Sequence, residues 1–331
     1  MSVTTLPQTY RRPRWAHLMA QNIGLELALF LLVACILAYC GVFYAQQHRF
    51  PGNFEITSTV NNTMPLVLAG MAQTLVVLTR GIDLSVGGII DLTNAVAAIT
   101  LGNTGGSMIL WSVIVLLIGA ACGLINGLLV GIGRLQPILV TLATLSIYQG
   151  IAIRVLPQPG GQVPEAYTAV LTNTLQPWAL LYVIALGVAW TAFRRSRLGV
   201  AIYAIGNDPQ AAQANGISTR RALILAYIIG GILSAAGGLF LASSATAGDA
   251  TTGNGFTLTS IVAVVLGGVS LFGGRGSAVG AIMGAFVINM IVNILFFSHI
   301  DPLYQAFYEG VFLVIAVLAA NFIGHLVRRR A

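Results

Sequence analysis

Long apolar runs follow one another along almost the whole chain, and they constrain its fold more than any other feature. Ten such runs are present, at residues 22–45, 60–79, 84–101, 108–131, 135–155, 177–193, 222–243, 257–272, 277–298 and 304–325. A helix needs about 20 apolar residues to cross a bilayer. Only 8% of the residues are charged, against about 25% in soluble domains. The sequence therefore predicts an all-α polytopic membrane protein with about ten transmembrane helices; because three of the runs are short, nine or eleven are the alternatives.

The basic residues test this count, because loops on the cytoplasmic side of a membrane are enriched in them. All 16 are arginines. With the amino terminus inside, only Arg49 and Arg154 fall in outer loops, and the other 14 fall inside. We therefore predict that both termini are cytoplasmic, with a tail at 1–20, one transmembrane domain at 21–326 and a basic tail at 327–331. The net charge of +7 is then explained by orientation, and we expect no nucleic acid as a partner.

Two loops stand out between the predicted spans. The stretch 194–221 is polar and bounded by arginines, and we expect it in the cytoplasm. Within it, Asp208 is a good N-cap, Pro209 suits the first helical turn and Gly216 suits a C-terminal stop. The sequence thus predicts a short capped helix there. The longest outer loop, 156–176, is equally compatible with an external partner and with an inert connector.

Residues that could carry enzymatic chemistry are sparse. The absence of lysine excludes a standard phosphate-binding P-loop. The three cysteines, Cys35, Cys40 and Cys122, lie inside apolar runs, and the four histidines do not cluster in the sequence. We therefore expect no metal site, no cofactor bound by this chain and no enzymatic activity.

Polar residues inside the predicted spans are candidates for a transport path, because such groups are costly in lipid. Asp91 lies deeper in its predicted span than Asp83. Asp83 lies beside Arg80, and we expect these two to neutralise each other. A path for a neutral solute needs hydrogen-bonding groups without fixed charge, whereas polar groups that only join helices are the alternative. The path candidates are Asn61, Gln73, Asp91, Asn94, Thr141, Gln149, Asn289 and Asn293.

Small residues and one internal echo indicate further organisation. Gly119, Gly123, Gly127 and Gly131 recur every four residues, as do Gly276, Gly280 and Gly284, and this spacing is typical of closely packed helices in lipid. The segment 76–88 (VVLTRGIDLSVGG) resembles 264–274 (VVLGGVSLFGG). The echo indicates a transporter built from repeats, or glycine-rich low complexity.

Four stretches together resemble the membrane permeases of ABC-type sugar importers, the group that takes up ribose, arabinose, xylose and galactose. They are GIDLSVGG (81–88), TLATLSIYQG (141–150), YAIGNDPQAAQANGIS (203–218) and IVAVVLGGVSLFGGRGS (261–277). They occur in the order of the family, and the similarity covers about residues 57–320. The residues of the first and last stretches that we assign to a structural motif are Arg80, Gly81, Asp83, Ser85, Gly87, Gly273, Gly274 and Arg275.

The resemblance implies a coupling helix that docks on a separate ATPase. Gln210, Ala211 and Ala212, with Gly216, fit the EAA-x3-G pattern of such helices, and Asp208 and Pro209 lead into it. Glutamine replaces the usual glutamate, so the shape is retained and a charge contact is in doubt.

The resemblance also implies partners and a place in the cell. These are a second permease copy or homologue, a cytoplasmic ATPase that holds ATP and Mg, and a periplasmic sugar-binding protein, around a chain in the bacterial inner membrane. One departure from the family is Asp91, at a position that is usually small or apolar.

Two other readings remain open at this point. A secondary transporter driven by an ion gradient would need no ATPase and would require an acid such as Asp91. A related permease for branched-chain amino acids, an autoinducer or nucleosides would share the coupling helix but carry another solute.

Overall fold

The computed structural model describes residues 14–173, 175–176, 178–301 and scattered positions between 304 and 318. Across these residues the chain is helical, and the only strand pairing described is an isolated bridge between Gly160 and Gly248. The helices are α1 (Arg14–Gln47), α2 (Asn53–Leu78), α3 (Val86–Thr100), α4 (Gly105–Gly131), α5 (Pro137–Val155), α6 (Glu165–Leu171), α7 (Trp178–Arg195), α8 (Arg197–Asn207), α9 (Pro209–Ala214), α10 (Thr219–Ala245), α11 (Asn254–Leu266) and α12 (Ala278–Phe297).

Nine of the ten predicted spans coincide with a described helix, namely α1 to α5, α7 and α10 to α12. Six of these, α1 from Gly24 on, α2, α4, α5, α10 and α12, are long and apolar enough to cross a membrane, and α3 and α11 are shorter apolar helices. The tenth span, 304–325, lies largely outside the described residues. The all-helical prediction is confirmed, whereas ten spans and the sides of the two termini stay predictions.

Several helix boundaries differ from those expected: α1 and α2 begin earlier, at Arg14 and Asn53, and one predicted span ends earlier. The predicted span 257–272 stops at Leu266, because Gly268 takes a left-handed backbone angle (φ 74°) and turns the chain. Helix α6 lies inside the loop 156–176, and α8 lies inside the polar stretch 194–221. Helix α8 has polar ends and a short apolar face, on which Ile202 and Ile205 are buried. We did not predict α8 from the sequence, because its apolar pattern extends over only 11 residues.

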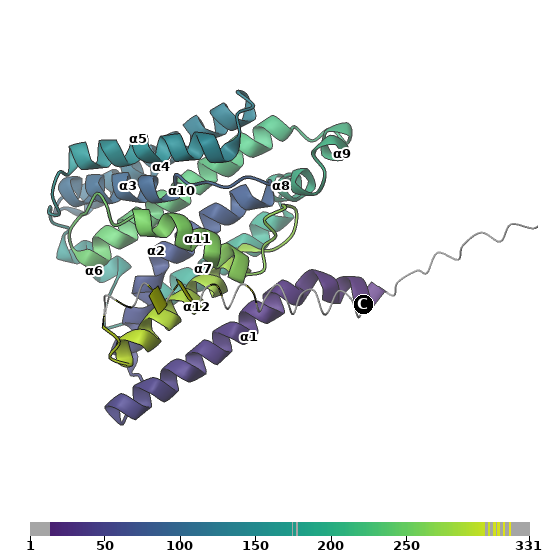
Figure 1. Cartoon of the computed structure of the whole chain (residues 1–331). Helices are drawn as coiled ribbons and strands as arrows, with labels where there is room; N and C mark the ends of the chain where they lie inside the picture. Colours follow the sequence, from purple (N-terminus) through teal and green to yellow (C-terminus); the bar gives the residue numbers. More distant parts are fainter. Residues whose placement is uncertain are drawn as a thin grey trace, which may run out of the picture.

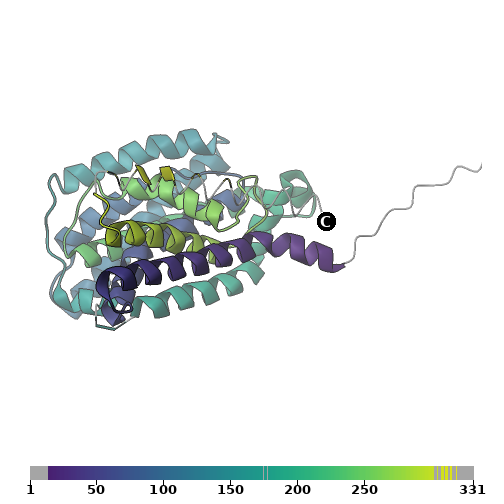
Figure 2. The same cartoon turned by 60° about the horizontal axis from the view of Figure 1, so that its bottom comes forward.

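Helices α10 and α2 form the centre of the bundle (Figure 1). Helix α10 packs against α4, α2 and α3, and α2 also packs against α12 and α11. Helix α1 packs mainly against α12, at the edge of the molecule. Helices α8 and α9 stand at one end of the bundle and α6 at the other, and α1 begins on the side of α9 (Figures 1 and 2). We call these the α9 end and the opposite end.

Close backbone approaches confirm the packing predicted from the small residues of α4 and from Gly280 and Gly284, whereas Gly276 lies in the turn before α12 and not on its face. A Cβ atom on Gly123 of α4 would lie 2.1 Å from Tyr227 O of α10, and one on Gly284 of α12 would lie 2.1 Å from Ala263 O of α11. Real Cβ atoms do not approach so closely, so only glycine fits there. By contrast, α2 is almost wholly buried, while α1, α4 and α5 expose long rows of leucine and isoleucine. Such outer rows are the surface that lipid tails would cover, as a multi-pass membrane protein requires.

Candidate functional site

The short helix predicted in the polar stretch 194–221 is confirmed as α9, with both of its caps. The Asp208 carboxylate accepts hydrogen bonds from the backbone N–H groups of Gln210 (2.8 Å) and Ala211 (3.0 Å). Pro209 takes the first helical position. At the other end Gly216 is left-handed (φ 79°), and Ile217 N donates to Ala212 O, which closes the helix in a Schellman motif.

Helix α9 presents one face to the protein and the other to solvent. Ala212 is buried against Ile205 and Ala222. The exposed residues are Gln210, Ala211, Gln213 and Ala214, all small or neutral. The backbone N–H groups of Ala211 and Gln210 lower the pKa of Asp208 below its usual value, so the cap is ionised at neutral pH. The exposed face therefore offers shape rather than charge to a partner.

Arg80 joins the end of α2 to the segment that leads into α9. Its Nε donates to Gly206 O (2.8 Å), and its second guanidinium nitrogen donates to Asn207 O. The expected neutral pair of Arg80 with Asp83 is wrong, because Asp83 instead accepts from Ser85 N and Ser85 Oγ. The reason is the left-handed backbone of Arg80 (φ 69°), at the point where the chain turns out of α2. One cation thus holds two carbonyl groups at the carboxyl end of α8.

The turn between α11 and α12 completes this junction. Gly274 N donates to Leu78 O (2.9 Å), and Asn207 Nδ2 donates to Gly274 O (3.2 Å). A Cβ atom on Gly206 would lie 1.8 Å from Leu78 O and 2.4 Å from Gly274 N, and one on Gly273 would lie 2.5 Å from Arg80 Cγ. Three chain segments therefore meet at backbone distance. We call residues 78–80, 206–207 and 270–276 the turn cluster.

The internal echo has a structural counterpart in the two helix ends that lead into the turn cluster. At the end of α2, Gly81 N donates to Val76 O and Arg80 is left-handed; at the end of α11, Val269 N donates to Val264 O and Gly268 is left-handed. Val76 and Val264 begin the two similar segments, so the caps fall at matching positions. The two segments end their helices in the same way and then contact each other.

Several predicted residues hold the segment 81–85 between α2 and α3. Ser85 Oγ accepts from Asn126 Nδ2 (2.8 Å), and Leu84 N donates to Thr141 Oγ1 (3.0 Å). The Gln73 amide, turned so that its nitrogen faces Asp83 O (2.8 Å) and its oxygen faces Asp83 N (3.2 Å), pairs with that backbone. Side chains of α2, α4 and α5 thus fix a buried turn that has no helix of its own.

Asp91 and Asn94 lie in α3 near the opposite end of the bundle. Both are buried. Asp91 Oδ1 accepts from Gly253 N, the N-cap of α11, and Asn94 Oδ1 accepts from Asp249 N (3.0 Å). Asp91 Oδ2 has no hydrogen-bond partner among the described residues. These two side chains anchor the connection 246–253 between α10 and α11, and a carboxylate at a helix N-terminus is electrostatically favourable.

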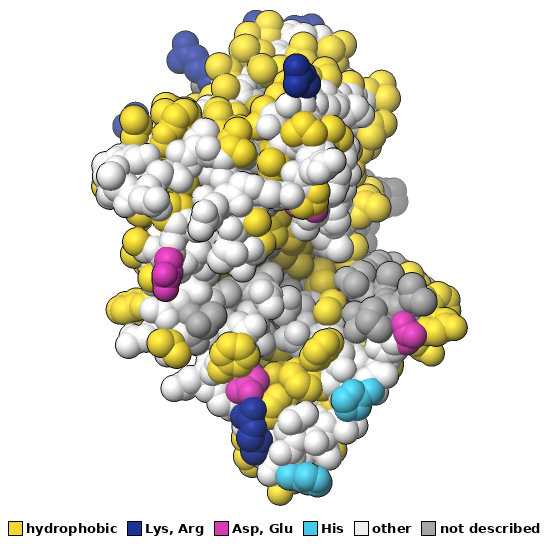
Figure 3. Space-filling model, turned by 90° about the vertical axis from the view of Figure 1, so that its left-hand side faces the viewer, with side chains coloured by type: hydrophobic (Ala, Val, Ile, Leu, Met, Phe, Trp, Pro, Cys, Tyr) yellow, Lys and Arg dark blue, Asp and Glu magenta, His cyan; other side chains and the backbone are white. Residues whose placement is uncertain are grey.

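The loop 156–176 is packed against the same connection. Gly160 and Gly248 exchange two backbone hydrogen bonds, and Val163 N donates to Thr246 O (3.1 Å). Figure 3, which views the opposite end, shows few charged side chains on this face and a surface hollowed near its middle. The two loops form one structured edge there.

The other path candidates lie elsewhere. Asn61 Nδ2 donates to Thr172 O (3.2 Å), Asn293 Nδ2 donates to Thr59 Oγ1 (3.1 Å) and to Asn289, and Gln149 is half-buried on α5. The eight candidates therefore form several separate groups and no single cluster. Their role in lining a path stays a prediction.

Sequence reasoning missed Gly206 and Asn207 of the turn cluster and Tyr203 beside it. Tyr203 OH donates to Gly276 O (2.6 Å), and the other two contact Arg80 and Gly274. The sequence did contain a signal for these residues, because all three lie just before Asp208 in the stretch 203–218, which resembles the permease family. Among the described residues no group of three or more histidine, cysteine or acidic side chains could hold a metal ion.

Comparison with known proteins gives a consistent result. The family model described as "Branched-chain amino acid transport system / permease component" matches residues 55–319. The chain is 30% identical to the ribose import permease protein RbsC of Haemophilus influenzae, over 90% of this chain and 92% of the relative. It is 34% identical to the autoinducer 2 import system permease protein LsrC of Enterobacter sp. strain 638, over 87% and 84%. No solved structure was found to match.

Proposed function

Because the chain belongs to the family of branched-chain amino acid transport system permease components, we propose that it is the membrane subunit of an ATP-driven ABC importer for a small sugar. In this role it carries out no chemistry and forms the path across the inner membrane. The ATPase, with its ATP and Mg, is a separate chain. A second permease subunit and a periplasmic sugar-binding protein complete the importer.

The observation that carries the proposal is the link between α9 and the central helix α2. Helix α9 is capped, exposes a small neutral face and is joined through Arg80 to the end of α2. A partner that moves α9 therefore moves α2 through hydrogen bonds, with no intervening flexible loop. Rigid-body rearrangement of packed helices is a common form of switching.

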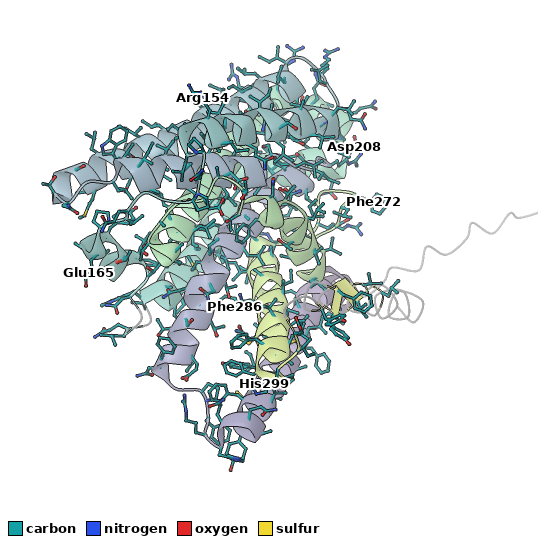
Figure 4. The ribbon with its side chains drawn as sticks, turned by 60° about the vertical axis from the view of Figure 1, so that its left-hand side comes forward. Arg154, Glu165, Asp208, Phe272, Phe286 and His299 are labelled. Carbon is teal, nitrogen blue, oxygen red and sulfur yellow. The ribbon has the colours of Figure 1, made fainter. Side chains whose placement is uncertain are left out.

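The distribution of arginine supports the side of the membrane that we assign to α9. Nine described arginines belong to loops or helix ends at the α9 end: Arg14, Arg80, Arg134, Arg194, Arg195, Arg197, Arg220, Arg221 and Arg275. Arg49 and Arg154 belong to the opposite end, and Figure 4 shows Arg154 away from Asp208. By the positive-inside rule the α9 end faces the cytoplasm, where an ATPase would reach it.

The substrate class rests on the relatives and on the polar groups of the chain. One relative imports ribose by name and another imports autoinducer 2. The polar side chains of the spans are mostly neutral amides and hydroxyls, and the buried acids Asp83 and Asp91 are engaged with backbone N–H groups. A neutral, hydroxylated solute suits such surroundings better than a charged one.

Reconstitution tests the proposal. The chain is incorporated into liposomes with the ATPase subunit that co-purifies with it, and with the binding protein of the same importer outside. Radiolabelled ribose uptake is measured with ATP and Mg inside, and a control receives a non-hydrolysable ATP analogue. We expect uptake only with hydrolysable ATP.

The alternatives give different results in the same vesicles. Uptake by the chain alone, driven by a proton or sodium gradient, would show a secondary transporter. ATP-driven uptake of autoinducer 2 or leucine in place of ribose would support the proposal of an ABC importer but would show that its substrate is not a sugar such as ribose.

A further inference from the structure

The turn between α11 and α12 presents the most exposed large hydrophobic side chain of the described residues. Phe272 is 89% exposed, and Leu271 beside it is exposed as well. Figure 4 shows Phe272 and Asp208 at the same edge of the molecule, with the Phe272 ring directed away from the body. A phenylalanine left in water forgoes the free energy of burying its apolar area, so this position would gain from a partner that covers the ring.

The turn holds this ring on a fixed backbone. Gly273 N donates to Ser270 O (3.0 Å), and Ser270 N donates to Arg275 O (3.0 Å). Gly273, Gly274 and Gly276 have φ angles of 83°, 68° and 118°, which side chains other than glycine rarely adopt. A preorganised aromatic group loses little conformational entropy when it binds.

The same turn is fastened to the segment that leads into α9. Gly274 O accepts from Asn207 Nδ2, and Gly276 O accepts from Tyr203 OH (2.6 Å). Gly206 and Gly274 approach so closely that a Cβ atom on Gly206 would lie 2.4 Å from Gly274 N. Phe272 and α9 therefore belong to one rigid unit, and a partner that docks on α9 meets a fixed aromatic ring beside it.

We propose that Phe272 is a second anchor for the ATPase, held beside α9 and inserted into an apolar pocket of that subunit with an acidic rim. The inference rests on the proposed function. The exposed face of α9 carries only small neutral side chains, whereas protein interfaces take most of their affinity from a few aromatic and arginine anchors. Exposed Arg275 lies three residues from Phe272 in the same turn, so acidic side chains around the pocket would complement it.

Binding measurements on substituted chains test this anchor. The full chain in detergent is titrated with the ATPase that co-purifies with the wild-type chain. Phe272→Ala should weaken the complex by about 10- to 30-fold, as loss of an interface anchor does, and Phe272→Leu should weaken it less. Phe296→Ala is the matched control, because Phe296 is also exposed but lies at the far end of α12; it should leave binding unchanged.

The outcomes separate the two proposals. If Phe272→Ala binds the ATPase as tightly as the wild type while Gly216→Arg on α9 prevents binding, Phe272 is no anchor and the proposed function stands. If Phe272→Ala instead only weakens retention of the chain in phospholipid vesicles, the ring contacts lipid and the anchor is refuted. If no ATPase binds the wild-type chain, both proposals fail.

Discussion

Replacing Arg80 by alanine tests whether motion at α9 reaches α2 through this one side chain. The substitution removes the hydrogen bonds to Gly206 O and Asn207 O. A hydrogen bond that involves a charged group contributes about 1.5–3 kcal/mol, but Arg80 is exposed, so water replaces part of each. We therefore expect a net loss of about 1–2 kcal/mol for the pair, which is a factor of roughly 5–30 in a two-state equilibrium.

We expect Arg80→Ala to retain ATPase binding but to lose much of the coupling between ATP hydrolysis and sugar uptake. The caps of α9 do not involve the Arg80 side chain, so the ATPase should still bind and hydrolyse ATP. We expect ATP-driven sugar uptake in proteoliposomes to fall by about 5- to 30-fold, with more ATP hydrolysed per sugar. Arg80→Lys, which keeps one charge and loses the two-nitrogen geometry, should lie between the wild type and Arg80→Ala. Unchanged uptake by Arg80→Ala would refute coupling through this side chain.

Three further substitutions follow from other contacts. Asp91→Asn keeps an acceptor for Gly253 N and should change ATP-driven uptake by less than about tenfold, whereas an ion-coupled transporter would lose uptake. Gly206→Ala places a Cβ atom 1.8 Å from Leu78 O and should destabilise the chain by about 1–3 kcal/mol, measured as its melting temperature in detergent; Gly41→Ala, with nothing within 4 Å, is the control. Asp208→Ala should remove the cap of α9 and weaken ATPase binding, whereas Asp208→Asn should retain much of it. Because the pKa of Asp208 is lowered, its cap is complete above the ordinary carboxylate pKa and is lost only as the pH falls through the lowered value, so ATPase binding should not vary between about pH 6 and 8.

Local rules predicted the long apolar helices and the caps of α9, because these depend on neighbouring residues. Asp208, Pro209 and Gly216 give α9 its start and its end within nine positions of the chain. Asp208 and the turn at Gly216 act through backbone hydrogen bonds that span two to five residues, and Pro209 acts through its fixed φ. The long apolar helices were likewise predictable, because a helix that crosses lipid needs about 20 apolar residues in a row.

The partners of polar groups were not predictable, because they depend on which distant segments meet. Arg80 and Asp83 are three residues apart, and adjacency favoured a pair. The left-handed turn at Arg80 instead directs its guanidinium to α8, 126 residues away in the chain. Gln73 and Thr141 were grouped with a transport path because they are polar, and in the fold both hold the segment 81–85. Sequence reveals that such groups need partners but does not reveal which ones.

The two matching helix caps give an independent reason to assign coupling to Arg80. Both turns need a left-handed residue, and α11 uses Gly268, for which that conformation is unstrained. At the matching position α2 has Arg80, which pays roughly 1–2 kcal/mol for the same backbone angle. A glycine at position 80 would therefore relieve strain in the turn itself. The strain at Arg80 is offset by its bonds to Gly206 and Asn207, which serve the junction with α9 rather than the cap of α2. Arg80→Gly should therefore retain more thermal stability than Arg80→Ala, because glycine adopts the left-handed backbone without strain. Both variants should lose sugar uptake equally, because both lack the hydrogen bonds to Gly206 and Asn207. Equal stability of the two variants would show that the backbone strain at Arg80 is negligible.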